Sequence, residues 1–521
     1  MNEYFVVVTD PQYKEEIHQE LLAAHGVDSI PNRPVACEDE MPFSEYNGIF
    51  LLTDAEAEKL LTDPRISDVH LSPSAVGAIR KHFGTRTAQY DKSASTMTNV
   101  MKNWGLGRCI SPVNNFGAGT STPTYTYNLT GAGVDVIMMD TGVEPNHPEF
   151  AVNADGTGGS RVVDFDWTQL GAITSVPTGG FLGDCDGHGS NCASIAAGNT
   201  QGWASNAAIY SLRVVSSGIG ATDYDITDGR QLGIVDEFQA WQSIRLFHLA
   251  KPITSTGYRR PTVVSCSYGY FTPYCTGGPM TSITYRGTTH VTNTTTGYAN
   301  LYGTIGGADN TFGGEHGYRY SAIDADVGSA IAAGVVVVGA AGNTVHKIDV
   351  PTGPDYNNYW TSSVYGPYYY HQGSSPAAAN GVITVGAISH TLPEHKISYS
   401  CTGPRINVFS PGNLIMGAYS SSTYSFNSVQ DPRNSLYWLN KLSGTSMACP
   451  QVTGVAALAL ELRPQYTATD VLNFISGTSA KNLLNETYYG GSGYTQYAGL
   501  QSASNNYLYM PFNLPNPLTI T

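Results

Sequence analysis

Apolar and polar positions alternate in three segments near the start of the chain, which predicts strands over 4–10, 46–54 and 66–73. Two other segments, 11–26 and 55–64, have helical spacing; the first stops at a glycine, and Asp54 is placed to cap the second. The order strand, helix, strand, helix, strand predicts a small α+β domain over residues 1–75. Residues 76–103 have little periodicity and carry Lys, Arg, Ser and Thr, so we expect an exposed linker there.

The pattern changes at residue 104, after which buried-type apolar strands alternate with helices. The expected strands cover 134–139, 208–215, 262–267, 335–340 and 382–387. The expected helices cover 188–198, 234–250, 321–333, 446–462 and 468–476. This alternation predicts an α/β domain over 104–521, built on a doubly wound parallel sheet with helices on both faces. Two long polar stretches, 271–318 and 344–375, are expected as surface insertions.

The composition narrows the classes of partner. Only 13% of the 521 residues are charged, and the net charge of −15 argues against a nucleic acid or an anionic membrane. A polar, weakly charged chain with 57 Gly and 34 Tyr is typical of extracellular or virion-exposed proteins. The start lacks a signal-type apolar run, and the most apolar stretch, 331–342, is glycine-broken and fits a buried strand better than a membrane span. We therefore expect a soluble chain without a membrane partner, whose export route the sequence does not reveal.

The cysteines indicate neither a disulfide scaffold nor a zinc module. Eight are scattered along the chain, and none form a CxxC pair. Cys266 and Cys275 are close enough in sequence to be a disulfide candidate, and two free buried thiols explain them equally well.

Asp140 and His188 stand where chemistry is often placed in α/β proteins. Asp140 follows a predicted parallel strand, at the edge where such sheets bind ligands. His188 lies between glycines at the start of a predicted helix. Taken singly, each is explained as well by a turn or a helix cap. A metal site formed by Cys185, His188 and Cys192 is a further alternative, but no fourth ligand has suitable spacing.

Ser446 and Asn343 complete a set of four. Ser446 begins a predicted helix, where its N–H has no intrahelical acceptor and points at any developing anion. Asn343 ends a predicted strand, where its amide could donate to an oxyanion. A cap and a turn would explain them one at a time, but the four contexts in the order Asp, His, Asn, Ser are hard to explain as caps and turns.

These motifs make the sequence resemble the subtilisin-like serine proteases, most closely their proteinase K branch. The matching residues are WGLGRCIS (104–111), DTGVEPNHPEF (140–150), DGHGSNCASIAAG (186–198), SCSYG (265–269), AAGN (340–343) and SGTSMACPQVTG (443–454). Residues 1–75 are similar to the ferredoxin-like propeptide domain that inhibits such enzymes. The resemblance implies a serine endopeptidase made as a self-inhibited zymogen, acting on protein or peptide substrates, with its own N-terminal domain as inhibitor and an autoprocessing site within 76–103.

By this resemblance Asp140, His188 and Ser446 form the triad, and Asn343 with the Ser446 N–H forms the oxyanion hole. The resemblance also implies that the substrate main chain pairs in β fashion with Ser267, Tyr268 and Gly269. One wall of the pocket for the residue before the cut would be formed by Ala340, Ala341 and Gly342. Cys192, one helical turn after His188, would lie beneath it. Tyr268 suggests an apolar or aromatic preference, and activity should rise with pH near neutrality as His188 loses its proton.

The sequence also departs from the family pattern. Cys449 and Gln451 replace the usual Thr or Ser and the usual His on the serine helix, outside the triad. Ser389, followed by His390, stands where the proteinase K branch has an Asp calcium ligand. We therefore expect no required cofactor and leave structural calcium open. The insertions flank both substrate segments and could narrow the cleft.

Two rival functions remain open on the sequence alone. A catalytically silent subtilisin fold, for example a structural or virion protein, fits the low charge and the polar insertions, while the filled four-residue site argues against it. A non-proteolytic hydrolase such as an esterase is the second rival, but the serine motif GTSMA is not the GxSxG elbow.

Overall fold

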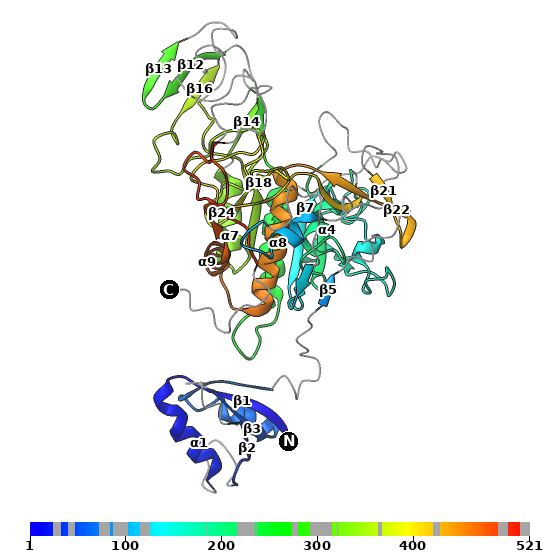
Figure 1. Cartoon of the computed structure of the whole chain (residues 1–521), viewed down its shortest axis with the longest axis vertical. Helices are drawn as coiled ribbons and strands as arrows, with labels where there is room; N and C mark the ends of the chain where they lie inside the picture. Colours follow the sequence, from blue (N-terminus) through cyan, green and yellow to red (C-terminus); the bar gives the residue numbers. More distant parts are fainter. Residues whose placement is uncertain are drawn as a thin grey trace. The chain divides into compact units, whose positions relative to one another are not determined.

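The structure is a computed structural model. It describes residues 1–23, 33–39, 47–71, 84–86, 103–114, 125–184, 186–215, 235, 237–273, 280–291, 315–319, 321–362, 367–419, 428–487 and 499–510. The chain forms two compact units, Met1–His82 and Phe83–Thr521. Each unit has its own apolar core, and Figure 1 labels the elements of both.

The first unit is a four-stranded antiparallel sheet with two helices. Its elements are β1 (Asn2–Val8), a 3₁₀ turn (Pro11–Tyr13), α1 (Lys14–Leu22), β2 (Cys37–Asp39), β3 (Asn47–Leu52), α2 (Asp54–Leu60) and β4 (Ile66–Leu71). The sheet order is β2-β3-β1-β4, and residues such as Val6, Ile17 and Phe50 fill its core. The expected order of strands and helices is present. The additional strand β2 is too short to show a period in the sequence.

The start of α2 differs from our expectation. Thr53, not Asp54, is the N-cap: its hydroxyl accepts from the Glu56 N–H at 3.3 Å, and the Glu56 carboxylate accepts from the Thr53 N–H at 2.8 Å. This reciprocal capping box satisfies two N–H groups that Asp54 alone could not. Asp54 instead accepts from the Tyr4 hydroxyl at 2.8 Å, which ties α2 to β1.

The second unit is built on a nine-stranded sheet in the order β23-β24-β19-β18-β15-β10-β7-β9-β8. Its strands are β7 (Asp135–Asp140), β8 (Val162–Val163), β9 (Ala208–Arg213), β10 (Thr262–Cys266), β15 (Val336–Ala340), β18 (Ile383–Ile388), β19 (Val408–Pro411), β23 (Ala480–Lys481) and β24 (Asn506–Tyr507). All neighbours pair in parallel except β23 with β24. The expected strands are all present, which confirms a doubly wound parallel sheet.

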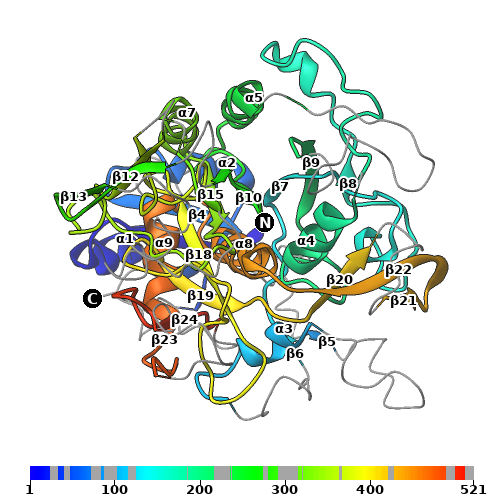
Figure 2. The same ribbon diagram turned by 90° about the horizontal axis from the view of Figure 1, so that it is seen from above.

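Helices cover both faces of this sheet. They are α3 (Trp104–Arg108), α4 (His188–Ala197), α5 (Glu237–Ala250), α7 (Ser321–Ala332), α8 (Thr445–Leu462) and α9 (Ala468–Thr478), with 3₁₀ turns at Pro148–Phe150 and Trp167–Leu170. Alternate residues of β7 enter different cores: Val136 and Met138 pack with α4 and α8, whereas Ile137 and Met139 pack with α5 and α7. Figure 2 shows α5 and α7 together on one side of the sheet. The expected helices lie within three residues of their predicted ends.

The two polar stretches expected as surface insertions contribute to one small sheet. It has the order β13-β12-β16-β17, with β12 (Met280–Tyr285) and β13 (Thr288–Val291) from the first stretch and β16 (Tyr359–Ser362) and β17 (Tyr368–Tyr369) from the second. Trp360 of β16 is fully buried, and its ring stacks on that of Tyr368 with the ring centroids 4.3 Å apart. A further pair joins β11 (Phe271–Pro273) to β14 (Glu315–Gly317). Residues 274–279, 292–314 and 363–366 of these stretches lie outside the described residues.

A three-stranded sheet leads directly into α8. It contains β20 (Ile415–Tyr419), β21 (Ser428–Asp431) and β22 (Asn434–Leu442). The buried pair of Arg433 with Glu149, 2.7 Å apart, and a bond from His147 Nε2 to the Trp438 carbonyl at 2.8 Å fasten it to the segment that follows β7. A separate pair, β5 (Gly84–Arg86) with β6 (Tyr125–Tyr127), includes part of the segment expected as a linker.

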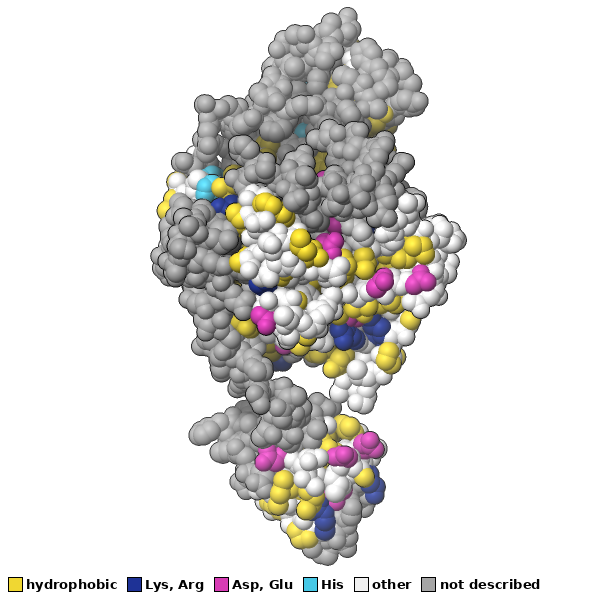
Figure 3. Space-filling model, turned by 90° about the vertical axis from the view of Figure 1, so that its right-hand side faces the viewer, with side chains coloured by type: hydrophobic (Ala, Val, Ile, Leu, Met, Phe, Trp, Pro, Cys, Tyr) yellow, Lys and Arg dark blue, Asp and Glu magenta, His cyan; other side chains and the backbone are white. Residues whose placement is uncertain are grey.

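The helices and the charged side chains of the structure both bear on which partners the chain can bind. In the described part of the chain, no helix combines the length and the apolar character that crossing a membrane requires. On the face in Figure 3, acidic and basic side chains form small separate groups among polar and apolar ones, in keeping with the 13% of charged residues.

Candidate active site

The predicted site residues gather where the strand order of the main sheet reverses. From β7 the chain proceeds to β9 on one side, and then crosses to β10, β15, β18 and β19 on the other. Such a reversal opens a crevice at the carboxyl ends of the strands. Asp140 is the last residue of β7, and Asn343 follows the end of β15.

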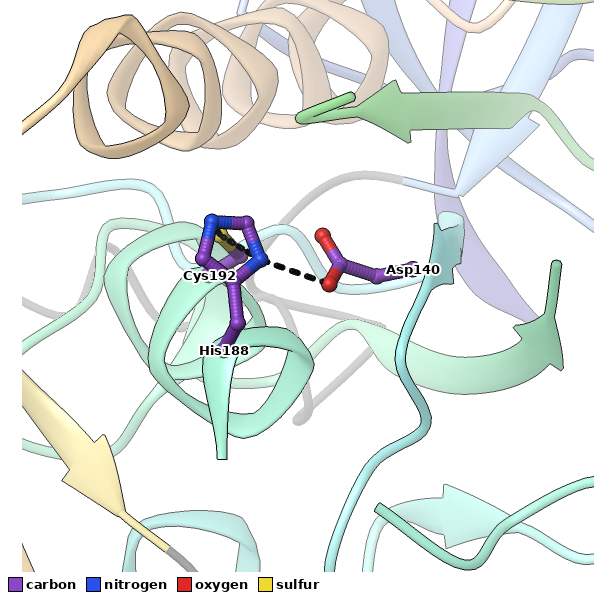
Figure 4. A group of neighbouring side chains, drawn as sticks. All are labelled: Asp140, His188 and Cys192. Carbon is purple, nitrogen blue, oxygen red and sulfur yellow. Dashed lines mark hydrogen bonds and ion pairs between the residues drawn. The ribbon is translucent and has the colours of Figure 1, made fainter. Parts of the chain in front are cut away.

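Asp140 and His188 form a hydrogen-bonded pair in which the carboxylate is buried (Figure 4). His188 Nδ1 lies 2.7 Å from Asp140 Oδ1, which also accepts from the Thr141 N–H at 2.8 Å. Because a carboxylate only accepts, Nδ1 carries the proton and Nε2 of the neutral ring is an acceptor. The Asp140 side chain is 1% exposed and is shielded from water, whereas the His188 side chain is 25% exposed.

The Asp140 charge controls the titration of His188. Burial by itself lowers the pKa of the imidazole, but the nearby Asp140 carboxylate outweighs it and holds the pKa of His188 well above its usual value. The second carboxylate oxygen, Oδ2, is buried and has no hydrogen-bond partner among the described residues. The imidazole of His188 is therefore the side-chain donor that this carboxylate binds in the described part of the chain.

Asp184 shapes the turn that presents His188, a role we missed in the sequence. Its carboxylate accepts from the Thr141 hydroxyl and the Gly187 N–H, both at 2.8 Å, and from the Ser190 N–H at 2.9 Å. Gly187 has φ of +95°, and a Cβ on Gly189 would lie 2.0 Å from the Gly142 carbonyl oxygen. The turn therefore needs both glycines. The sequence signal for this role was the position of Asp184, an aspartate four residues before the start of the predicted helix.

Cys192 lies where its helical spacing predicts, beside His188. Its Sγ is 3.8 and 4.0 Å from the two ring nitrogens, and burial raises the pKa of its thiol, which keeps it protonated. Ligand atoms of Asp140, His188 and Cys192 lie within 4.8 Å of one another. A structural zinc site would need a fourth donor and His188 Nδ1 is already bound by Asp140, so this set fits a metal poorly. Cys185 lies outside the described residues.

Ser446 lies at the second position of α8, with its backbone fixed next to Cys192. Pro450, four residues later, has no N–H, so the Ser446 carbonyl lacks its helical donor. That oxygen instead accepts from Ser267 Oγ at 2.9 Å and from Cys192 Sγ at 3.4 Å. The Ser446 hydroxyl donates to the Ser267 carbonyl at 2.9 Å, and the described residues include no hydrogen bond between it and His188. Cys192 thus lies in contact with both His188 and the Ser446 main chain, and in the described part of the chain no bond joins the serine to the histidine.

Asn343 is exposed, and its amide is oriented by the residue before Ser446. Its Oδ1 accepts from the Thr445 N–H at 2.9 Å and the Thr445 hydroxyl at 3.0 Å. The amide nitrogen therefore faces away from Thr445. That Nδ2 and the Ser446 N both lie 3.5 Å from the point where a Cβ on Gly444 would be, so the two nitrogen atoms lie close to one point in space.

The two expected substrate segments both contact the start of α8, Ser267 through the Ser446 carbonyl and Gly342 through the Thr445 hydroxyl. Ala341 and Gly342 are bonded to neighbouring segments through the Val385 carbonyl and the Thr445 hydroxyl. By contrast, the main-chain amides and carbonyls of Tyr268 and Gly269 make no hydrogen bond within the described part of the chain. An extended segment with unpaired main-chain groups can pair with a peptide in β fashion.

The departures from the family pattern lie outside this site. Gln451 accepts from the buried Trp203 Nε1 at 2.6 Å, and the Cys449 thiol packs 3.5 Å from the Val338 carbonyl. The Ser389 hydroxyl pairs with Thr391 at 2.8 Å, and His390 pairs with Asn413. Cys266 is a free buried thiol, and its candidate disulfide partner Cys275 is not among the described residues.

Comparison with known proteins gives the family of this chain. The Subtilase family model matches residues 131–500. The chain is 28% identical to an extracellular serine proteinase of Thermus sp. (strain Rt41A) over 390 residues, which are 74% of this chain and 62% of that protein. It is 25% identical to a subtilisin-like serine protease of Davidiella tassiana over 419 residues, which are 80% of this chain and 59% of that protein.

The chain spans about 60% of the length of these curated relatives. A solved structure of a cold-adapted subtilisin-like serine proteinase aligns with 78% of this chain and 98% of its own, at 22% identity and a TM-score of 0.47. The sheet order and the family match identify the fold independently of that superposition. Because the family model covers most of the chain, including both the His188 and Ser446 motifs, this protein belongs to the subtilase family.

Proposed function

We propose that this chain is a serine endopeptidase that works through Asp140, His188 and Ser446. The observation that carries the proposal is the hydrogen-bonded Asp140–His188 pair, with Cys192 in contact with both the His188 ring and the Ser446 backbone. A 2.7 Å bond fixes the imidazole tautomer, so Nε2 can take a proton. Family membership supports the same chemistry.

The reaction begins with a rotation of the Ser446 side chain away from the Ser267 carbonyl and toward His188. His188 Nε2 takes the hydroxyl proton while Oγ attacks the peptide carbonyl, and Asp140 stabilises the resulting imidazolium. Asn343 Nδ2 and the Ser446 N–H bind the tetrahedral oxyanion. His188 then protonates the leaving amine, the acyl-enzyme forms, and water repeats the cycle. No step needs a metal or cofactor, and structural calcium would serve stability alone.

The substrate is an extended peptide that pairs with the main chain of Tyr268 and Gly269. Ala340, Ala341 and Gly342 form the facing wall beside the residue before the cut. The aromatic ring of Tyr268 favours an apolar or aromatic residue in this cleft.

We propose further that the first unit is an inhibitory propeptide cut off within 76–103. Its independent core and its α+β order support this role. The name of the Thermus relative supports action outside the cell.

A substitution of the nucleophile tests the activity. Ser446→Ala should abolish cleavage of a denatured protein substrate and labelling by a fluorophosphonate, while circular dichroism and the melting temperature stay those of the parent. A parent that neither cleaves nor is labelled would favour the catalytically silent alternative, because only an activated serine reacts. Comparing a peptide amide with an ester of the same acyl group separates a protease from an esterase.

A further inference from the structure

Glu237 connects three aromatic side chains next to the proposed substrate-binding strand. It is the first residue of α5 and is 7% exposed. Its Oε1 accepts from the Tyr268 hydroxyl at 2.7 Å and from Trp241 Nε1 at 3.1 Å, and its Oε2 accepts from the Tyr270 hydroxyl at 2.5 Å. Three donors and the amino end of a helix suit an ionised carboxylate, which accepts only.

The segment from 267 to 270, between β10 and β11, is held at its two ends by other contacts. Ser267 is bonded to Ser446 at one end, and the Tyr270 N–H donates to the Ser375 carbonyl at 3.3 Å at the other. Between them, the main chain of Tyr268 and Gly269 is unpaired within the described residues. The polar contact that holds this middle part is the bond from Tyr268 to Glu237.

The Tyr268 phenol remains a donor over the working pH range. Burial and then the Glu237 charge hold the pKa of Tyr268 well above its usual value. The rings of Tyr268 and Tyr270 also pack against the apolar core formed with α5 and α7. With both hydroxyls bound to one carboxylate, these rings can offer only carbon surface to a ligand.

We propose that Glu237 is a positioning residue for substrate: it holds Tyr268 so that the main chain of 268–269 stays extended and available to a peptide. This rests on the proposed function and adds to it a determinant of extended-peptide binding. Glu237 does not touch the reacting atoms. Its loss affects the binding of residues that pair with this strand and leaves the attack by Ser446 intact.

The test compares two substrates, an oligopeptide amide with several residues before the cut and an ester with one. Glu237→Gln keeps the side-chain volume but removes the charge. Tyr268→Phe keeps the ring but removes the hydroxyl. We expect the KM for the oligopeptide to rise about tenfold in either variant, the effect of one hydrogen bond to a charged group. The kcat for both substrates and the KM for the ester should change less than about twofold.

Tyr210→Phe is the matched control, because Tyr210 packs against the same apolar core and, in the described part of the chain, is not among the three donors that bond Glu237. It should leave both substrates unaffected. If Glu237→Gln does not fold, as judged by its melting curve, Tyr268→Phe decides alone. An unchanged KM for the oligopeptide, or an equal loss on both substrates, overturns the positioning role. A parent that turns over neither substrate overturns the proposed function and this inference together.

Discussion

At the scale of single residues, the Asp140 carboxylate sets the chemistry of the site. One of its oxygens binds His188, and the other is buried without a partner in the described chain. A buried charge with so little solvation interacts strongly with the imidazole beside it. The sequence led us to expect activity that rises near neutrality; the raised pKa of His188 moves that rise to higher pH.

The pH dependence of the reaction follows from the sign of this shift. A protonated His188 cannot take the Ser446 proton, so kcat/KM should rise as pH increases through the pKa of His188, with a midpoint above the usual value of about 6.5. In Asp140→Asn the largest cause that raises the pKa of His188 is gone while burial still lowers that pKa, so the midpoint should move to lower pH and the rate should fall. Pre-steady-state or kcat/KM profiles from pH 5 to 10 measure both. Equal midpoints in the two proteins would contradict this account.

The oxyanion donor offers a second test at this scale. Asn343→Asp keeps the oxygen that Thr445 binds and replaces only the Nδ2 donor. We expect kcat to fall about 10²–10³-fold with little change in KM, as for the loss of one oxyanion donor. Asn343→Ala also lacks the Nδ2 donor, so its kcat should fall by a similar factor. A loss in Ala but not in Asp would instead assign Asn343 a purely structural role.

At the scale of elements, two helices carry the proposed catalytic residues His188 and Ser446. α4 begins at His188, α8 begins one residue before Ser446, and the two helices pack against each other. Close approach of α4 to the turn after β7 depends on a glycine, since a Cβ on Gly189 would lie 2.0 Å from the Gly142 carbonyl oxygen. Small residues at these positions thus set the distance between Asp140 and His188.

A pair of helix glycines tests this dependence. Gly189→Ala should displace α4 and lower both the melting temperature and kcat, because backbone atoms cannot move aside cheaply. Gly328→Ala in α7 is the control: nothing lies within 4 Å of its Cβ position, so the change should leave activity unaltered and stabilise by about 0.4–1 kcal/mol. Thermal melts and kcat measure the outcome. Similar behaviour of the two variants would show that the close approach is unimportant.

At the scale of the whole molecule, two units with separate cores share one chain. In the larger unit, two stretches distant in sequence build one small sheet after β10 and β15. Arg286 of the first stretch and Asp355 of the second form a bidentate pair at 2.6 and 3.0 Å. This joins the loops that follow the two proposed substrate segments.

Processing is the prediction that belongs to this scale. The parent chain should shorten on purification, with a new N-terminus within 76–103, whereas Ser446→Ala should keep its full mass. N-terminal sequencing and intact mass measure the site, and a serine inhibitor added at lysis should delay the cut. A Ser446→Ala chain that shortens at the same bond would mean that another protease makes the cut.

The sequence by itself determined the parallel sheet, and it also supplied the four residues that we propose for the active site. Buried strands such as 134–139 are continuous apolar runs, and the motifs around Asp140, His188, Asn343 and Ser446 are local, so both are visible without coordinates. Their local contexts also placed Cys192 correctly beside His188.

The tertiary structure alone decided the features that depend on distant partners. The sheet of β12 and β16 pairs polar strands far apart in sequence, and short polar strands have no readable period. Asp184 and Glu237 acquire their roles only when folding brings Thr141 or Tyr268 to them. Local patterns record which face of a segment is buried, whereas hydrogen-bond partners are fixed by the packing of elements that the chain order does not place side by side.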